Sequence, residues 1–469
     1  MNKLKEIFIN NRFIITVLAV GAILRLLFLT KEGLWHDEAL TGISAVKPFW
    51  QMISFQFYLG HTPLYLLIIK PLVFIFGDSE LVLRLPSVIF GVLAVYALFL
   101  LADKLFKNKL MVYTSTALFA LSALQIHFSQ EARPYTMLVF FVILSFYLLL
   151  KALEDESVKS WFLYSIATLV AIYISASALP VLAVQFVYSL IKKRGSFRFN
   201  TSLVAIAFIY APMFFYYFIR GSYKMRWFTP LNMKTFTNLF YGYLLLPIPI
   251  LEEVGIAGFY SVVMKLLSFL LLIPLAYGIY SVWKKRKEED SSSVLLLWLW
   301  IIVPILIELI YSLSIRPILG YKRYIIAFSP PLYLLLSHGL WEMSPKTIKK
   351  AACIALIVLF SIPLFSYYSM IKNEDWRGAI RYVSENVSLG DPVFTDYLGI
   401  PMFEYYWKGR PVRLFDVWNL YSFDFKTGWL ILRDDRFNDN FGDGSKLRKD
   451  FKISDVEGFI DIKLIKLER

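Results

Sequence analysis

The sequence has little of what builds disulfides, cysteine metal clusters or charged surfaces. Its only cysteine, Cys353, lies in an apolar run, which excludes a disulfide framework and a cysteine-ligated metal cluster. Charged residues make up only 18% of the 469 positions. No soluble segment interleaves basic and aromatic residues, so nucleic-acid binding is not expected. No internal repeat is visible either, although many transporters contain one.

Hydrophobic residues fill most of the chain: they account for 58% of it, and the mean hydropathy is +0.59. This composition predicts a polytopic α-helical membrane protein. The first apolar stretch runs to Thr30, longer than the core of a signal peptide, so an uncleaved first span is expected. A span needs about 20 mostly apolar residues. The sequence offers eleven candidates: 13–30, 83–102, 111–126, 134–150, 161–176, 178–191, 201–219, 259–282, 294–314, 324–340 and 351–369.

Lysine and arginine are distributed unevenly between the two sides of these spans. With the N-terminus in the cytoplasm, the cytoplasmic segments hold 19 of them in 60 positions, and the outer segments hold 11 in 108. Cytoplasmic loops of membrane proteins are enriched in these residues. The pattern predicts a multi-pass protein of the cell membrane with its N-terminus in the cytoplasm.

Two regions depart from the pattern of regular spans. The first outer loop, 31–82, contains the apolar but short stretch "HTPLYLLIIKPLVFIFG", which is typical of a helix that lies in the membrane interface. After residue 369 long apolar runs vanish. "WRGAIRYVSENV" has helical spacing, and "DPVFTD", "PVRLFDV" and "GWLILRD" are typical of short strands. The sequence therefore predicts a transmembrane domain over 1–369 and a small extracytoplasmic α/β domain over 370–469.

Polar residues gather on the outer side of the predicted spans. Asp37 and Glu38 stand side by side in "GLWHDEALTG", directly after the first span. The other members of this outer group are Arg25, His61, Lys70, Arg84, Glu131, Arg133, Lys322 and Arg323. A carboxylate can remove a proton from an acceptor hydroxyl, and arginine or lysine can hold a departing phosphate.

Each of these residues also has an ordinary structural explanation. Carboxylates at loop edges are often solvated helix flanks, and arginines near span ends reach back to the interface. Glu308 lies inside a span, where an acid is a functional candidate by default. It favours a transporter, whereas the clustering of the other charges at one face favours an enzyme.

Five short motifs occur in a characteristic order: "LRLLFL…LWHDEAL", "HTPLYLLIIKP", "LRLPSVIFGVLAV", "SQEARPYTMLVF" and "YKRYIIAFSPPLYLLLS". In these the chain resembles the GT-C glycosyltransferases of the protein O-mannosyltransferase and lipid A aminoarabinose-transferase kind, often called family 39-like. The resemblance covers roughly the first 150 residues and the span near 320–340.

The resemblance implies a GT-C fold and a sugar donor carried on a polyprenyl phosphate in the outer leaflet. The family's catalytic aspartate falls on Asp37, with Glu38 as its partner, and a further acidic residue falls on Glu131. His61 matches a family segment that here departs at Thr62 and Leu66. The donor would be bound by cations and neighbouring groups of the outer side, namely Arg25, His61, Lys70, Arg84, Arg133, Tyr321, Lys322 and Arg323.

The implied reaction is a single inverting displacement at the anomeric carbon. A lipid monophosphate carries less charge than a nucleotide diphosphate, so arginines could replace a metal and no obligatory cofactor is expected. A divalent-metal site built from His61, His127 and the carboxylates is the alternative. The expected partners are the lipid-linked donor, the bilayer, and a glycolipid, polymer or protein acceptor. The sugar stays open, and so do two rival functions: a lipid or solute transporter or flippase, and a non-catalytic subunit of glycan assembly.

Overall fold

The computed structural model describes residues 12–191, 197–220, 231–232, 235, 269–284, 290–315, 317–319, 321–369, 373–409, 411–442, 444–456 and 458–469. The chain divides into two compact units. The first comprises residues 1–27, 57–65 and 85–370, and the second comprises 28–56, 66–84 and 371–469. The second unit thus adds two pieces of the first outer loop to the C-terminal residues. The predicted domain boundary at 369/370 stays a prediction.

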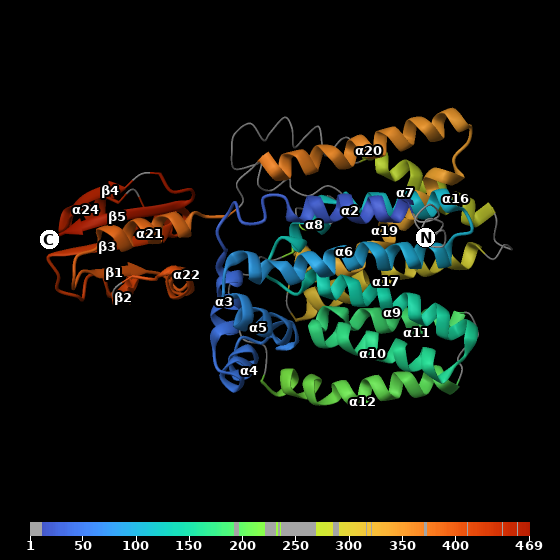
Figure 1. Cartoon of the computed structure of the whole chain (residues 1–469), viewed down its shortest axis with the longest axis horizontal. Coiled ribbons are helices and arrows are strands. Elements are labelled where there is room, and N and C mark those ends of the chain that lie inside the picture. The colour runs from blue at the N-terminus through green and yellow to red at the C-terminus, as the bar shows by residue number, and fades with distance from the viewer. Residues whose placement is uncertain are drawn as a thin grey trace, which may run out of the picture. The chain divides into compact units, whose positions relative to one another are not determined.

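The first unit is a bundle of helices that run roughly parallel to one another (Figure 1). Its α-helices are α2 (Arg12–Leu26), α6 (Glu80–Leu105), α7 (Lys109–Ala120), α8 (Ala123–Ser129), α9 (Tyr135–Asp155), α10 (Val158–Ile174), α11 (Leu179–Ile191), α12 (Phe197–Arg220), α16 (Leu272–Lys284), α17 (Asp290–Ser314), α18 (Lys322–Ile325), α19 (Pro330–Glu342) and α20 (Lys346–Ser369). Short 3₁₀ turns interrupt them: η1 (Ala176–Ala178), η2 (Phe269–Leu271) and η3 (Ile326–Phe328).

Five of the described helices are long and apolar enough to cross a membrane: α6, α9, α12, α17 and α20. The pair α7 and α8 passes the same test together but bends by 51° at its break. The prediction of a multi-pass helical membrane protein is confirmed. The predicted total of eleven spans stays a prediction, because part of the candidate at 259–282 lies outside the described residues.

The break between α7 and α8 has a local cause. Ser122 adopts an extended backbone conformation, and its hydroxyl accepts a hydrogen bond from the backbone N–H of Gln125. A serine in this position caps the start of a new helix. The predicted continuous span over 111–126 is therefore two helices.

Buried polar side chains tie three helices of the bundle together. The Tyr164 hydroxyl of α10 donates to Gln185 Oε1 of α11 at 2.9 Å, and Gln185 Nε2 donates to Ser145 Oγ of α9 at 3.0 Å. All three side chains are buried. Hydrogen bonds of this kind help to determine which helices pack together in a bilayer, because lipid tails are as apolar as the helix surfaces and apolar burial alone does not select the pairs.

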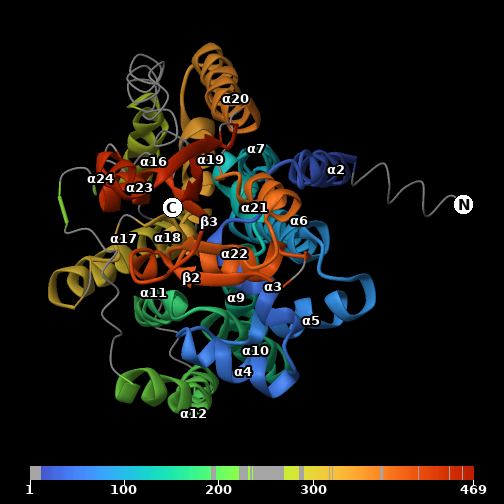
Figure 2. The same ribbon diagram turned by 90° about the vertical axis from the view of Figure 1, so that its left-hand side faces the viewer.

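The second unit combines three short helices of the first outer loop with a five-stranded sheet. Its loop helices are α3 (His36–Val46), α4 (Phe49–Tyr58) and α5 (Leu64–Phe76). Its C-terminal elements are α21 (Trp376–Asn386), β1 (Pro392–Thr395), α22 (Gly399–Tyr406), β2 (Arg413–Asp416), η4 (Val417–Asn419), β3 (Thr427–Arg433), α23 (Asp434–Phe441), α24 (Ser445–Asp450), β4 (Lys452–Val456) and β5 (Ile462–Glu468). Figure 2 turns these C-terminal elements toward the viewer.

The sheet has the order β2-β1-β3-β5-β4. β1 pairs in parallel with β2 and β3, whereas β3 and β4 pair antiparallel to β5. All four residues of β1 are buried, as expected for a central strand covered on both faces. The predicted small α/β domain is confirmed, including the predicted helix at α21 and the strands at β1, β2 and β3.

The α16–α19 crossing allows a sharp test of helix packing. A Cβ added at Gly339 would lie 1.7 Å from the backbone oxygen of Pro274, whereas one added at Gly278 would have its nearest neighbour at 3.5 Å. We expect Gly339→Ala to force the helices apart and to destabilise the protein by about 1–3 kcal/mol. Thermal unfolding in detergent checks this, with Gly278→Ala as the matched control that melts like the wild type. Equal melting of both variants would contradict the close crossing.

Candidate functional site

The acidic pair lies on the first turn of α3. Successive residues of a helix point about 100° apart, so Asp37 and Glu38 face different surroundings. Glu38 is fully buried and Asp37 is half-buried. The start of a helix favours negative charge, and Glu38 Oε2 also accepts a hydrogen bond from the backbone N–H of Trp35 at 3.3 Å. The turn therefore holds one carboxylate inside the protein and leaves the other partly exposed.

Arg84 lies in the first residues of α6, which belong to the second unit like Glu38, and it forms a bidentate ion pair with Glu38. Its Nε donates to Oε1 at 2.8 Å and its Nη2 donates to Oε2 at 2.7 Å. Arg84 is 3% exposed and Glu38 is fully buried, so both charges are shielded from water and neither is left unpaired. Such fork-to-fork pairs fix geometry as well as charge.

The remaining donors of Arg84 bind backbone oxygens of the segment that leads into α3. Nη1 donates to the carbonyls of Leu29 and Glu32 at 2.7 and 3.0 Å, and Nη2 donates to the carbonyl of Gly33 at 2.9 Å. A guanidinium has five N–H groups, and all five are engaged by the protein. Arg84 therefore fixes the loop before Asp37 and has no donor left for a phosphate.

Contacts with α22 hold the same loop from its other side. The Tyr406 hydroxyl accepts from the backbone N–H of Leu34 and donates to Glu80 Oε1, both at 2.6 Å. Burial and the charge of Glu80 raise the pKa of Tyr406. His36 Nδ1 lies 3.1 Å from the carbonyl oxygen of Leu398. Because a carbonyl only accepts, Nδ1 carries the proton in this contact.

Arg25, on α2 in the first unit, is fully buried and binds within the helix bundle. Its Nη1 donates to the carbonyls of Gly21 and Ala120 at 3.0 and 3.1 Å, and its Nε donates to Ser129 Oγ at 3.1 Å. Ala120 is the last residue of α7, so Arg25 satisfies a carbonyl left without a helical partner at the bend. A Cβ added at Gly91 would lie 2.9 Å from Arg25 Nε, so this position needs glycine to make room.

Gln130 joins three helices just before Glu131. Its Nε2 donates to the carbonyls of Arg25 and Leu27 at 3.1 and 2.8 Å, and its Oε1 accepts from the Tyr367 hydroxyl at 2.8 Å. Gln130 thereby caps the C-terminal end of α2 and fixes the end of α8 to α20. Sequence patterns did not single out Gln130, although its place inside the "SQEARPY" motif was a signal.

The turn after α8 carries Glu131 and Arg133 of this motif and lies next to His127 of α8. His127 Nε2 lies 3.2 Å from Glu131 Oε1, one helical turn away. The backbone N–H of Arg133 donates to the Glu131 carbonyl at 2.8 Å, and its guanidinium lies 5.8 Å from the centre of the Tyr135 ring. The predicted neighbours Glu131 and Arg133 therefore share one turn, with His127 at its edge.

The other predicted donor-binding residues lie on several elements. His61 is exposed and precedes α5. Tyr321 directly precedes α18 and Arg323 lies within it, and both are half-buried. The Arg323 guanidinium lies 5.4 Å from the centre of the Tyr324 ring. The side chain of Lys322 lies outside the described ones. Lys70 of α5 is bonded at the C-terminal end of α3, whereas Asp37 is at its N-terminal end.

Glu308, the acid that favoured a transporter, is buried in α17. It is 2% exposed, and neither carboxylate oxygen has a hydrogen-bond partner among the described residues. Within the described part of the chain, no three His, Cys, Asp or Glu residues are grouped so that they could hold a metal ion.

Comparison of the sequence with known families gives one match. Residues 60–219 match the family model described as dolichyl-phosphate-mannose-protein mannosyltransferase. No curated protein sequence is detectably similar to the chain.

Solved structures are similar over nearly the whole chain. ArnT from Cupriavidus metallidurans in the apo state has 11% identity and a TM-score of 0.62, covering 97% of this chain and 98% of that one. ArnT bound to undecaprenyl phosphate has 12% identity, a TM-score of 0.56 and the same coverage. AglB, an oligosaccharyltransferase of Archaeoglobus fulgidus, in complex with an inhibitory peptide and a dolichol-phosphate, has 12% identity and a TM-score of 0.58, covering 97% and 74%. The Archaeoglobus enzyme has also been solved with zinc and sulfate.

The ion pair between Glu38 and Arg84 predicts that substitution of Glu38 lowers the stability of the protein and that substitution of Asp37 does not. Glu38→Gln removes the charge that balances a buried guanidinium, and we expect it to destabilise the protein by about 3–5 kcal/mol. Asp37→Asn changes a half-buried side chain and should melt like the wild type. Thermal unfolding of both variants in the same detergent tests this, and a Glu38→Gln protein as stable as the wild type would exclude the structural role.

The carbonyl caps at the end of α2 predict a specific role for Gln130. Gln130→Leu leaves the buried Arg25 carbonyl and the partly buried Leu27 carbonyl without this donor, and we expect a loss of about 1–3 kcal/mol. The midpoint of thermal unfolding measures this loss. Gln51 of α4 is exposed, so Gln51→Leu is the control with the same change of side chain. A Gln130→Leu variant no less stable than this control would show that the caps contribute nothing.

Proposed function

We propose that this chain, which has the fold of the GT-C glycosyltransferases, is a membrane enzyme that moves a sugar from a polyprenyl-phosphate donor to an acceptor hydroxyl. The family match over residues 60–219 and the full-length likeness to ArnT support the class of reaction. The structures of ArnT with undecaprenyl phosphate and of AglB with a dolichol-phosphate support a lipid-linked donor.

The observation that carries the proposal is the state of the acidic pair. Glu38 is bound by Arg84 at both oxygens and is fully buried, whereas the next carboxylate, on Asp37, is half-buried on a turn that this ion pair holds in place. A base must be fixed and must also be reachable by the hydroxyl from which it takes a proton. Asp37 meets both conditions.

In the proposed step, Asp37 takes the proton of the acceptor hydroxyl as the hydroxyl oxygen attacks the anomeric carbon. The bond between that carbon and the phosphate oxygen breaks, and the electron pair leaves with the lipid phosphate. The anomeric centre is inverted by this single displacement. Arg133, Lys322 and Arg323 are the cations assigned to the phosphate, and Glu131 remains the further acidic candidate.

Three residues have a supporting role in this proposal. Glu38 and Arg84 position Asp37 and do not contact the reacting atoms. Arg25 fixes the bend between α7 and α8, which precedes the turn that carries Glu131 and Arg133.

The donor chemistry makes a metal unnecessary in this mechanism. A monophosphate leaving group can be stabilised by guanidinium and ammonium groups. We therefore assign no obligatory cofactor, and a divalent ion held by His61, His127 and the carboxylates stays the alternative. The excess of lysine and arginine in the inner loops supports an N-terminus in the cytoplasm and the C-terminal domain outside the cell membrane.

A second candidate function follows from Glu308. A buried carboxyl without hydrogen-bond partners among the described residues is expected in a proton-coupled transporter. Proton-driven uptake into vesicles that is lost in Glu308→Gln would support a transporter and weaken the transferase.

The transferase is tested by radiolabelled sugar transfer in membranes that contain the protein, with a panel of polyprenyl-phosphate sugars as donors. We expect Asp37→Asn to lower turnover by about 10²–10⁴-fold, the usual contribution of a general base, while its melting stays that of the wild type. Asp103→Asn is the control, because Asp103 is a surface acid paired with Lys109. Near-normal turnover in Asp37→Asn would refute the mechanism, and no transfer from any donor by a folded wild type would refute the class.

A further inference from the structure

The first outer loop forms a second polar position, at the other end of α3 from Asp37. Lys70 of α5 donates from Nζ to the carbonyl oxygens of Ala45 and Lys47 at 3.1 and 2.5 Å. These carbonyls belong to the C-terminal end of α3. Asp37 and Ala45 are eight residues apart on this helix, which separates them by about 12 Å along the axis. That distance is too long for Lys70 to hold a phosphate that leaves an anomeric carbon beside Asp37.

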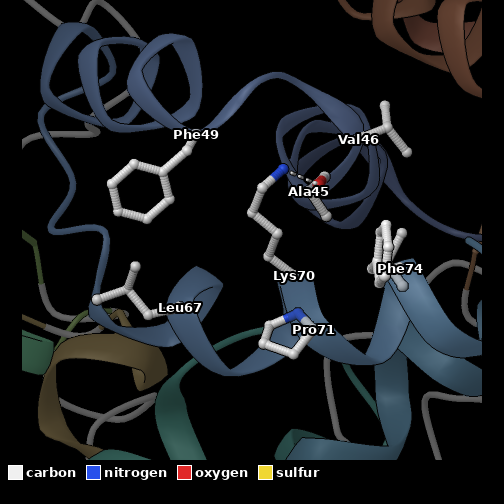
Figure 3. Close-up of a pocket in the computed structure, with 8 residues that line it drawn as sticks. Ala45, Val46, Phe49, Leu67, Lys70, Pro71 and Phe74 are labelled. Carbon is white, nitrogen blue, oxygen red and sulfur yellow. Dashed lines mark hydrogen bonds between the residues drawn. The ribbon is translucent and has the colours of Figure 1, made fainter.

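Lys70 reaches across a cavity of about 560 Å³ between α3, α4 and α5. Figure 3 shows Phe49 and Leu67 on one side of the lysine and Val46 and Phe74 on the other. The complete lining is Ala45, Val46, Phe49, Leu67, Lys70, Pro71, Val73 and Phe74. Lys70 is the one charged residue in this lining, so the cavity has apolar walls and a single cation.

The charge of Lys70 is not balanced by any acid of the described residues. Its two bonds to carbonyls hold the ammonium in place but do not neutralise it, and its third N–H has no acceptor among those residues. Another lysine of the same loop, Lys47, does have an acidic partner, because its Nζ lies 3.6 Å from Glu404 Oε1. A half-buried lysine without a counter-charge favours an anionic ligand.

Two apolar residues of the lining are strongly exposed: Phe74 is 90% exposed and Val46 is 56% exposed. Trp50, which is 76% exposed, packs its ring 5.1 Å from the ring of Phe49 in the same lining. Large exposed apolar residues that gather beside a tryptophan and a lysine, in a multi-pass membrane protein, are typical of contact with the membrane surface. A free phosphate would gain nothing from such walls, whereas a lipid buries its chains against them.

We propose that this cavity, which we call the Lys70 pocket, binds an anionic phospholipid of the surrounding membrane. The phosphate accepts the third N–H of Lys70, and an acyl chain packs against Phe49, Leu67 and Phe74. An anionic lipid is preferred over a zwitterionic one because the latter brings its own cation. This assignment gives Lys70 a role apart from the donor, and it does not depend on the transferase activity.

The experiment measures the thermal midpoint of the full chain in detergent as lipids are added. Phosphatidylglycerol should raise the midpoint with saturation, whereas phosphatidylcholine and glycerol phosphate should not. Lys70→Met keeps the apolar stem and removes the charge, and should weaken the apparent affinity for phosphatidylglycerol about fivefold. Lys31→Met is the matched control, because Lys31 is an exposed lysine of the same loop, and its affinity should be unchanged.

A second variant keeps Lys70 and its carbonyl bonds in place. Leu67 is 40% exposed and lies one helical turn before Lys70, so Leu67→Glu supplies an internal counter-charge and should remove the preference for phosphatidylglycerol. Equal stabilisation by phosphatidylcholine, or an unchanged affinity in both variants, would overturn the proposal. Displacement of phosphatidylglycerol by equimolar undecaprenyl phosphate, dependent on Lys70, would overturn it in favour of the donor lipid. None of these outcomes bears on transfer by Asp37.

Discussion

The buried guanidinium of Arg84 is the interaction on which the arrangement around the acidic turn depends. It is 3% exposed, and each of its five N–H groups meets a carboxylate or carbonyl oxygen. An ion pair in such surroundings tolerates no missing partner, because a charge left alone there is far more costly than in water. The complete set of acceptors therefore fixes the path of the chain from Leu29 to Glu38 and with it the position of Asp37.

The same requirement shapes the end of the first helix. The last carbonyls of α2 have no partners within the helix, so other parts of the protein supply the donors. Gln130 donates to the carbonyls of Arg25 and Leu27, and Arg25 in turn donates to the carbonyl of Ala120 at the bend between α7 and α8. Gln130 and Arg25, which hold the turn that carries Glu131 and Arg133, thus donate hydrogen bonds to backbone carbonyls. Their side chains set where Glu131 and Arg133 lie.

Local patterns in the sequence predicted the elements better than the roles of residues. The span at 134–150 corresponds to α9, and "DPVFTD" corresponds to β1, because hydropathy and the period of apolar residues act over short distances. Arg84 and Arg133 looked alike in sequence, since each lies within a motif on the predicted outer side. Only the fold shows that Arg84 has every donor engaged by the segment around Leu29 and Glu38. In the sequence, Lys70 was grouped with the donor-binding cations. Only the structure shows that Lys70 binds the C-terminal end of α3 and is separated from Asp37 by the length of that helix.

Asp37 and Glu38 are adjacent acids at the start of α3, and an explanation of this turn has to account for both. A carboxylate that accepts two bonds from a buried guanidinium is held too firmly, and too far from water, to take a proton from a hydroxyl. A carboxylate on a loop with no such anchor would lack a fixed position. Because neighbours on a helix point about 100° apart, one turn can supply both kinds at once: Glu38 paired with Arg84 inside the protein, and Asp37 half-buried beside it. The pair "DE" is therefore the shortest sequence that provides an anchored and partly exposed carboxylate at the start of α3.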